Sequence, residues 1–264
     1  MTVDAPRKTP VVPVPAATLM LLRDVRDGLE VLMTVRHDAA GFAAGAMVFP
    51  GGKTAPEDLL LVDAAANPAG LEMGPLVSRI AAIRETFEEG TVLLARAHGE
   101  QSILSQAALA KLLTRIPDRR DFGAFVARAG IVLGTDLLVP FAHWITPVDQ
   151  PKRFDTQFYL APAPADQVAL HDGREAVEVR WLAPAAAVAA ADRGEIKLVF
   201  ATRANLLRLA RSRTVAEAFD AARAARIVTV EPMLVETPAG AVFRIPADAG
   251  YEVTETPVRR VTRA

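Results

Sequence analysis

The sequence predicts an α/β fold in which helices cover a mixed β-sheet. Three observations predict it: β-compatible runs joined by turn residues, helical periodicity in the middle and near the C-terminus, and the lack of a regular strand–helix–strand repeat. The 264 residues, 51% of them hydrophobic, suffice for one full core. We therefore expect residues 11–264 to form a single domain with additional C-terminal helices and a small hairpin.

The N-terminal part predicts a tail, a hairpin and a glycine loop. Residues 1–10 are polar and contain two prolines, which is typical of a flexible tail. Residues 16–23 and 29–36 form a predicted hairpin, because Asp27-Gly28 between them is a turn signal. Residues 46–49 predict a short strand that runs into Pro50-Gly51-Gly52. Two glycines after a proline predict a loop whose backbone comes close to another group.

The remaining elements follow in order. Residues 56–75 form an irregular insertion with one short helix, because proline and glycine punctuate it. A helix runs from Pro75 to about Glu89, since proline favours the first helical turn. Further helices are predicted at 102–116, 121–129, 184–193, 202–211 and 214–225, strands at 137–144, 153–160 and 177–182, and a terminal hairpin from 227–235 and 241–245.

Composition excludes several classes of protein. No apolar run reaches the roughly 18 residues that span a bilayer, because Arg23, Asp24 and Arg26 interrupt the best candidate. The N-terminus lacks the order of a secretory signal, and the chain has no cysteine for disulfides or thiolate metal sites. A net charge of -1 without a basic cluster argues against polymeric nucleic acid as a partner. We expect a cytoplasmic protein.

The helix at 75–89 carries an unusual concentration of negative charge. At about 100° per residue, its apolar side chains form one stripe, and Glu85, Glu88 and Glu89 share the opposite side. Like charges at this spacing repel each other, so something should compensate them. Arg84 can offset one charge, and Mg²⁺ or Mn²⁺ suits a set of carboxylate oxygens. The alternative interpretation is an ordinary solvated face of an exposed helix.

The charged residues resemble the Nudix box, G-x5-E-x7-R-E-U-x-E-E-x-G-U, where U is aliphatic. Gly52 matches the first glycine, and Asp58 takes the place of the first glutamate. The R-E and E-E pairs are matched by Arg84, Glu85, Glu88 and Glu89, and Val92 matches the final aliphatic position. The chain departs from the pattern at three places. Residues 59–83 stand where seven are usual, Thr86 replaces an aliphatic residue, and Gly90-Thr91 puts the glycine one position early.

A long insertion at this point is similar to that of the Nudix subgroup of the peroxisomal acyl-CoA diphosphatase type. That subgroup also resembles the chain at residues 81–89, 141–147 and 153–161. The resemblance implies a Nudix-like α/β/α sandwich and a metal-dependent hydrolase, a diphosphatase, that cleaves the diphosphate linkage of a nucleoside diphosphate derivative. It implies Glu85, Glu88 and Glu89 as metal ligands for Mg²⁺ or Mn²⁺, with Arg84 as an orienting residue.

Residues outside the acidic helix are candidates for substrate binding. Gly51 and Gly52 would support the phosphates with their backbone, and Lys53, Arg36 and Arg153 would contact them, although each cation is also an ordinary surface or strand residue in the alternative interpretation. An extra carboxylate is expected from Glu175 or Glu178, and we favour Glu178 because it lies within a predicted strand. Core positions are expected for Trp144 and Trp181, and the four scattered histidines suggest no zinc site.

The substrate stays open at this stage. CoA or acyl-CoA is favoured because of the insertion, whereas ADP-ribose, NADH and nucleotide sugars remain alternatives. A homodimer is an assembly that we consider. A second hypothesis is a catalytically weak or inactive Nudix-fold protein that binds a ligand or a regulatory partner, prompted by Asp58 and by the displaced glycine. We expect Gly90 to end the helix one residue early, in a left-handed cap.

Overall fold

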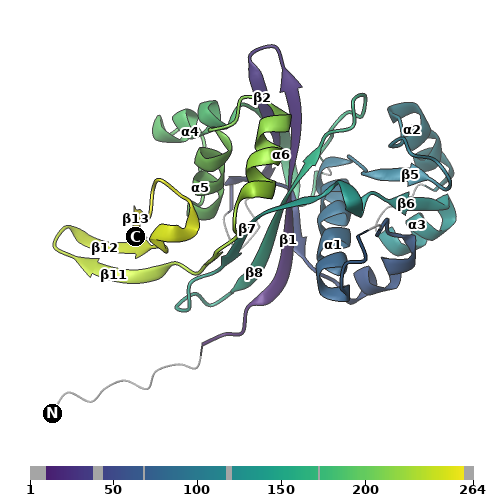
Figure 1. The fold of residues 1–264 in the computed structure, drawn as a ribbon. Coiled ribbons are helices and arrows are strands. Elements are labelled where there is room, and N and C mark those ends of the chain that lie inside the picture. Colours follow the sequence, from purple (N-terminus) through teal and green to yellow (C-terminus); the bar gives the residue numbers. More distant parts are fainter. Residues whose placement is uncertain (1–9, 38–43, 68, 117–120, 172, 259–264) are drawn as a thin grey trace.

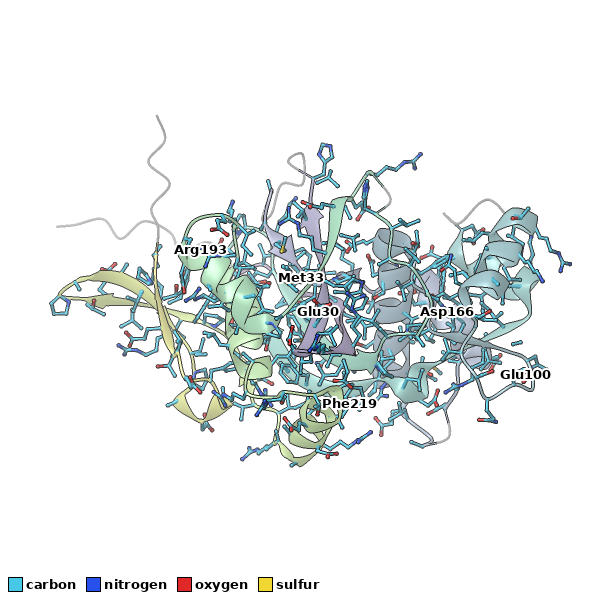
Figure 2. The ribbon with its side chains drawn as sticks, turned by 90° about the horizontal axis from the view of Figure 1, so that it is seen from above. Glu30, Met33, Glu100, Asp166, Arg193 and Phe219 are labelled. Atoms are coloured by element: carbon cyan, nitrogen blue, oxygen red, sulfur yellow. The ribbon has the colours of Figure 1, made fainter. Side chains whose placement is uncertain are left out.

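The computed structural model describes residues 10–37, 44–67, 69–116, 121–171 and 173–258. A central mixed sheet separates two groups of helices (Figure 1). In the view from above, Glu100 and Arg193 lie toward opposite ends of the molecule, with Met33 of the sheet between them (Figure 2). The predicted α/β sandwich is confirmed. The predicted tail lies outside the described residues except for Pro10, and the single-domain organisation stays a prediction.

The central sheet has eight strands. Its main path runs β10 (Thr229–Val230), β7 (Val139–Ile145), β8 (Phe154–Pro162), β1 (Val14–Val25), β2 (Gly28–Arg36) and β3 (Met47–Val48), while β4 (Gly51–Lys53) pairs with β1 and β9 (Ala176–Leu182) pairs with β2. Strands β1 and β8 are parallel, as are β7 and β10, and the other pairs are antiparallel. The predicted hairpin is β1 and β2, with Val25 opposite Gly28 at its turn.

One side of the sheet is covered by the helix that carries the glutamates, α1 (Met73–Gly90), together with α2 (Gln106–Arg115), α3 (Phe122–Ala129) and the 3₁₀ helices η1 (Pro56–Ala64) and η2 (Thr135–Leu137). The other side is covered by α4 (Pro184–Asp192), α5 (Phe200–Leu209) and α6 (Val215–Ala224). Strand β1 feeds both cores because its side chains alternate. Leu19 and Leu21 face the α1 side, while Met20 and Leu22 face α5 and α6.

Small elements account for most differences from the sequence expectations. The expected loop at Gly51-Gly52 is the strand β4, because its backbone pairs with Ala17 and Thr18 of β1. Two three-residue strands, β5 (Ala95–Ala97) and β6 (Ile131–Leu133), were not expected and pair with each other. The expected terminal strand at 227–235 divides between β10, which joins the main sheet, and β11 (Met233–Thr237). Strand β11 pairs with β12 (Gly240–Arg244), and β13 (Glu255–Pro257) extends that hairpin to three strands.

The last 3₁₀ helix, η3 (Ala247–Ala249), precedes β13. Within the described ranges, none of the helices has both the length and the apolar character that crossing a membrane requires.

Candidate active site

Helix α1 is buried on nearly all sides, which distinguishes it from an exposed amphipathic helix. The stripe of Leu76, Ile80, Ile83 and Phe87 packs into the core on one side. Among the acidic residues, Glu85 and Glu89 are only 9% and 4% exposed. The interpretation of a solvated acidic face is therefore wrong for these two side chains. Burial without compensation would cost several kcal/mol per charge, so the structure must provide partners.

Strand β4 meets the acidic side of α1 at its two glycines. The Gly51 N–H donates to Glu89 Oε2 at 3.3 Å. A Cβ added at Gly52 would lie 2.5 Å from the carboxylate carbon of Glu85, and one at Gly51 would lie 2.5 Å from the Ala17 carbonyl oxygen. A side chain at Gly51 would collide with the β1 backbone, so this position requires glycine, whereas a side chain at Gly52 would force the Glu85 carboxylate to move. The close backbone approach expected from the sequence is present, with the glutamates as the partner.

Three carboxylates from two parts of the chain converge beside this strand. One oxygen each from Glu85, Glu89 and Glu175 lies within 4.8 Å of the others. Glu85 and Glu89 are one helical turn apart on α1, and Glu175 directly precedes β9, where its carbonyl oxygen accepts the His37 N–H at 3.0 Å. Strand β9 is next to β2 in the sheet, which brings Glu175 to the helix.

The spacing of these oxygens fits a divalent cation. Mg²⁺ holds its oxygen ligands at about 2.0–2.1 Å, so two ligands on opposite sides of the ion are about 4.2 Å apart. Oxygens within 4.8 Å of one another can reach this geometry with small side-chain movements. The donor set consists of carboxylates alone, which suits Mg²⁺ or Mn²⁺ better than a soft metal. The residues present therefore fit the cation that the acidic helix suggests.

Arg84 connects the acidic helix to the insertion. Its Nε donates to Asp58 Oδ1 at 2.7 Å and its Nη2 to Asp58 Oδ2 at 3.2 Å. Nη1 donates to Glu85 at 2.8 Å and to Glu88 at 2.9 Å, and Nη2 also reaches the Lys53 carbonyl oxygen at 2.8 Å. Asp58 is fully buried and its other partner is the Ala55 N–H. A carboxylate at position 58 thus fixes the guanidinium that orients Glu85 and Glu88.

Glu88 differs from its two neighbours. Its side chain is 31% exposed and pairs with Arg84, and the structure does not bring it into the group with Glu175. The reason is helical geometry, since Glu85 and Glu89 project in nearly the same direction and Glu88 is turned about 100° from Glu89.

Burial makes the two inner glutamates hard to ionise without a cation. Burial is the largest cause that raises the pKa of Glu85 to about 7, although the Arg84 charge partly opposes it. Burial, followed by the charge of Glu85, raises the pKa of Glu89 to about 8, although Arg36 and the Gly51 hydrogen bond favour its charged form. The pKa of Glu88 is also raised by burial. Carboxyls with such pKa values gain most from a bound divalent cation.

The cations expected near the phosphates fall into two groups. Arg36, at the end of β2, is close enough for its charge to act on Glu89, and its Nε is a buried donor with no hydrogen-bond partner among the described residues. Lys53 follows the two glycines in β4 and its side chain is exposed. Of these two cations, Arg36 lies beside the carboxylate group, whereas Lys53 is an exposed residue at the end of β4.

Arg153 has a structural position instead. Its side chain is 7% exposed and donates to the Thr146 carbonyl oxygen at 3.0 Å, to the Val11 carbonyl oxygen at 2.8 Å and to Glu231. The expectation that Arg153 contacts substrate is thus corrected. Its guanidinium ties together the N-terminal segment, the β7–β8 connection and the chain after β10, because all of these pass the start of β8.

The carboxylate that lies close to Glu85 and Glu89 is Glu175 and not the favoured Glu178. Glu178 lies within β9, as expected, but its side chain pairs with Arg180 at 2.5 Å and is 43% exposed. The ordered strand that favoured Glu178 directs this side chain away from the helix. Glu175 was weighed from the sequence as well, but only the pairing of β9 with β2 shows which of the two reaches α1.

The end of helix α1 also differs from the expectation. Gly90 is still helical, and Thr91 takes the left-handed conformation with φ of 56°. Position 91 is where the Nudix pattern has its glycine, so the backbone keeps the usual helix end and a threonine occupies the strained residue. The expected early end at Gly90 is therefore wrong.

The tryptophans lie where the sequence places them. Trp144 is 5% exposed, and Trp181 packs at the edge of the α1-side core. His143 contacts Asp155 at 2.5 Å and Thr229 at 2.8 Å, away from the carboxylate group. In the described part of the chain, the group of Glu85, Glu89 and Glu175 contains no histidine.

Comparison with known proteins agrees with this geometry. The family model described as the NUDT19 Nudix domain matches residues 66–209, more than half of the chain. Among curated proteins, a putative Nudix hydrolase 7 of Caenorhabditis elegans is 31% identical over 64% of this chain and 52% of its own length. The acyl-coenzyme A diphosphatase NUDT19 of Gallus gallus is 28% identical over 60% of this chain and 55% of its own length. The chain thus spans about half the length of these two relatives.

A solved structure gives the same result for the fold. The crystal structure of a Nudix hydrolase from Alicyclobacillus acidocaldarius superimposes with a TM-score of 0.67 at 26% identity, covering 79% of this chain and 96% of the other. The match of sequence and fold, together with the acidic helix facing a glycine strand, leads to one conclusion. The chain belongs to the Nudix hydrolase family, in the group of the NUDT19 Nudix domain.

Proposed function

We propose that this chain is a Mg²⁺- or Mn²⁺-dependent hydrolase that cleaves the diphosphate linkage of a nucleoside diphosphate derivative, with CoA or acyl-CoA as the favoured substrate. The observation that carries the proposal is the convergence of Glu85, Glu89 and Glu175 beside Gly51 and Gly52. The Gallus gallus relative is an acyl-coenzyme A diphosphatase, which supports the substrate class.

Each residue of the site has a role in this proposal. Glu85, Glu89 and Glu175 would hold the cation, which when bound neutralises phosphate charge and lowers the pKa of a water molecule. Arg84 keeps Glu85 and Glu88 in place through its bidentate pair with Asp58.

The substrate is held by groups on the neighbouring strands. Arg36 would direct its guanidinium charge toward a phosphate, and Lys53 adds a second positive charge. In the reaction, the oxygen of a water molecule bonds to one phosphorus and the bond from that phosphorus to the bridging oxygen breaks. The water proton passes to solvent, and each product leaves with one of the two phosphoryl groups as a phosphate monoester.

A purely ligand-binding role is less well supported. Its motivation was the Asp58 substitution and the displaced glycine, yet Asp58 holds Arg84 through two hydrogen bonds and Thr91 reproduces the left-handed helix end. The residues that departed from the pattern therefore preserve the geometry that hydrolysis needs.

Product analysis with a substrate panel tests this function. Wild-type protein with Mg²⁺ or Mn²⁺ is mixed with CoA, acyl-CoA, ADP-ribose, NADH and nucleotide sugars, and the phosphate-containing products are separated by chromatography. We expect turnover of CoA or its acyl form. In Glu89→Gln the rate should fall by more than the roughly 10- to 100-fold typical of an outer-shell change, and Glu178→Gln should behave as wild type. Absence of turnover of every compound, or equal rates for Glu89→Gln and wild type, would contradict the proposal.

A further inference from the structure

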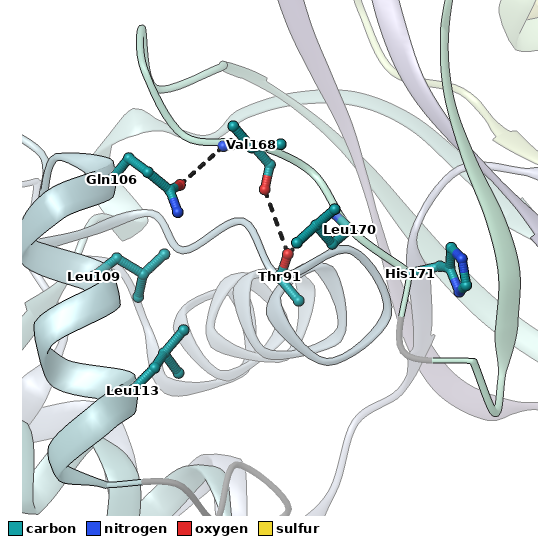
Figure 3. Close-up of a pocket in the computed structure, with 7 residues that line it drawn as sticks. All are labelled: Thr91, Gln106, Leu109, Leu113, Val168, Leu170 and His171. Atoms are coloured by element: carbon teal, nitrogen blue, oxygen red, sulfur yellow. Dashed lines mark hydrogen bonds between the residues drawn. The ribbon is translucent and has the colours of Figure 1, made fainter.

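A segment outside the Nudix pattern lies, along the chain, between helix α1 with its Glu85 and Glu89 and the third carboxylate, Glu175. Residues 166–171, which we call the strap, cross the C-terminal end of α1 and the N-terminal end of α2 before the chain reaches Glu175 (Figure 3). The Leu170 N–H donates to the Gly90 carbonyl oxygen and to Thr91 Oγ1, each at 3.0 Å. Thr91 Oγ1 in turn donates to the Val168 carbonyl oxygen at 3.5 Å. The strap therefore caps the helical turn that carries Glu89.

Gln167 attaches the strap most firmly. Its Nε2 donates to the carbonyl oxygens of Leu93 at 3.0 Å and Leu104 at 2.7 Å, and its Oε1 accepts the Leu93 N–H at 2.8 Å. Both amide N–H groups and the amide oxygen of Gln167 are used, so this one side chain makes hydrogen bonds to three backbone groups of Leu93 and Leu104. Leu93 follows Thr91 closely, so this clamp lies next to the end of α1.

Apolar packing contributes little to the position of the strap. A cavity of about 380 Å³ separates the strap from α2, and its apolar lining includes Leu109 and Leu113 (Figure 3). Val168 and Leu170 are 56% and 58% exposed. The remaining contacts to α2 are polar: Gln106 Oε1 accepts the Val168 N–H and Asp166 accepts the Gln106 N–H, both at 3.0 Å. Ala169 is the strap residue that packs against the α1-side core, and the other attachments of the strap are hydrogen bonds.

We propose that Gln167 and Thr91 are positioning residues, which fix the strap and thereby hold Glu175 and Glu89 at the distance that a shared cation requires. Glu175 is held by the His37 N–H at its carbonyl oxygen and by β9 beyond it, and the strap is a further attachment on the N-terminal side, ending four residues before Glu175. The inference rests on the proposed function, because the shared cation is part of it. It extends that function to residues that contact neither the cation nor the substrate.

Cation affinity, measured on the 264-residue chain, tests the role of Gln167. In Gln167→Leu, whose side chain has a similar size, we expect Mn²⁺ to bind about tenfold more weakly, as for other outer-shell partners. The kcat should fall, whereas the KM for the diphosphate substrate at saturating Mn²⁺ should change little. Asn67→Leu is the matched control, because the Asn67 amide also makes two hydrogen bonds to backbone, both to Leu71, in a loop that does not lead to Glu175. It should keep wild-type Mn²⁺ affinity.

A second pair of variants keeps the test valid if Gln167→Leu fails to fold. Thr91→Val removes the hydroxyl but keeps the branched shape, and should weaken Mn²⁺ binding several-fold. Thr91→Ser keeps the hydroxyl and should restore it. Equal Mn²⁺ affinity in folded Gln167→Leu, Thr91→Val and wild type would overturn the positioning role, even if the wild type is an active hydrolase. Inactivity of the wild type on the whole panel would instead overturn the proposed function, and the Mn²⁺ affinities would still decide the positioning role.

Discussion

Between the sheet and helix α1 the structure buries charges, whereas between the sheet and helix α5 it buries a neutral network. On the α1 side, Asp58, Glu85 and Glu89 are each at most 9% exposed. On the α5 side, Trp144 Nε1 donates to the Tyr251 hydroxyl at 2.8 Å, and that hydroxyl donates to Asn205 Oδ1 at 2.7 Å. The two cores are similar in size and share the same sheet. They nevertheless bury different kinds of polar side chain.

We interpret the buried charges on the α1 side as residues that serve catalysis, and the neutral side chains on the α5 side as residues that stabilise the fold. Buried charges are costly, and well-packed apolar residues would often serve stability better. A network of neutral side chains carries no charge-burial cost, although Asn205 Nδ2 in it is a buried donor with no hydrogen-bond partner among the described residues. We therefore expect changes on the α1 side to act on catalysis and on metal-linked stability, and changes on the α5 side to act on stability alone.

The largest effect is expected where strand β4 meets α1. In Gly52→Ala the new methyl group displaces the carboxylate of Glu85, and a shift of about 1 Å in a reacting group can cost about hundredfold in rate. The kcat of purified protein with Mg²⁺ measures this. Gly74→Ala is the matched control, because nothing lies within 4 Å of the added Cβ there. A Gly52→Ala enzyme with wild-type kcat would show that the close approach is not needed.

An intermediate effect is expected from pH in the absence of metal. The pKa values of Glu85 and Glu89 in the folded protein are about 7 and about 8, above the ordinary 4.5. Between about pH 4.5 and pH 8 the folded state therefore binds more protons than the unfolded state. The free energy of unfolding should therefore fall as pH rises from 5 to 8, by up to about 6 kcal/mol if the two carboxyls titrate independently. Urea titrations at several pH values in EDTA measure it.

Metal and mutation sharpen this pH prediction. Mg²⁺ should offset the loss increasingly toward pH 8, because it binds the deprotonated carboxylates. Glu89→Gln should show a shallower fall in EDTA and little effect of Mg²⁺. Stability that rises steadily from pH 5 to 8 in EDTA would contradict the assignment of raised pKa values to the α1 side.

The smallest effect on activity is expected on the α5 side. Tyr251→Phe leaves the Trp144 N–H and the Asn205 side-chain oxygen without their shared partner, which should lower the free energy of unfolding by about 1–3 kcal/mol. Its kcat and Mn²⁺ affinity should equal those of the wild type. Thermal unfolding and a rate assay below the melting temperature measure both. A large loss of kcat in a folded Tyr251→Phe protein would remove the distinction between the two cores.

The sequence predicted what local patterns determine. The Asp27-Gly28 turn placed the hairpin, and apolar spacing placed α1 to within two residues at its start and one at its end. The charged pattern around Arg84 identified the family, and the expectations for Glu85, Glu89 and the two glycines anticipated residues that the structure brings together. The cytoplasmic location and the homodimer stay predictions.

What the sequence missed depends on contacts between distant residues. Strand β4 contains two glycines, which are poor strand formers, and it forms because its backbone pairs with β1. The Glu85 carboxylate lies against Gly52, which leaves no room for a side chain there unless Glu85 moves. Arg153 looked available for phosphates until its backbone acceptors were known. The register of β9 on β2 decides which of Glu175 and Glu178 lies near α1, and the sequence does not show that register. Gln167 belongs to no sequence motif, so its three hydrogen bonds could not be predicted.

Mn²⁺ binding, followed by electron paramagnetic resonance, tests most directly whether the α1 side is a metal centre. The wild type and Glu178→Gln should bind Mn²⁺ with the same affinity at pH 7.5, whereas Glu175→Gln should bind it at least about tenfold more weakly and Glu85→Gln/Glu89→Gln should show no specific binding. Unchanged Mn²⁺ binding in Glu175→Gln and in the double variant would contradict the assignment.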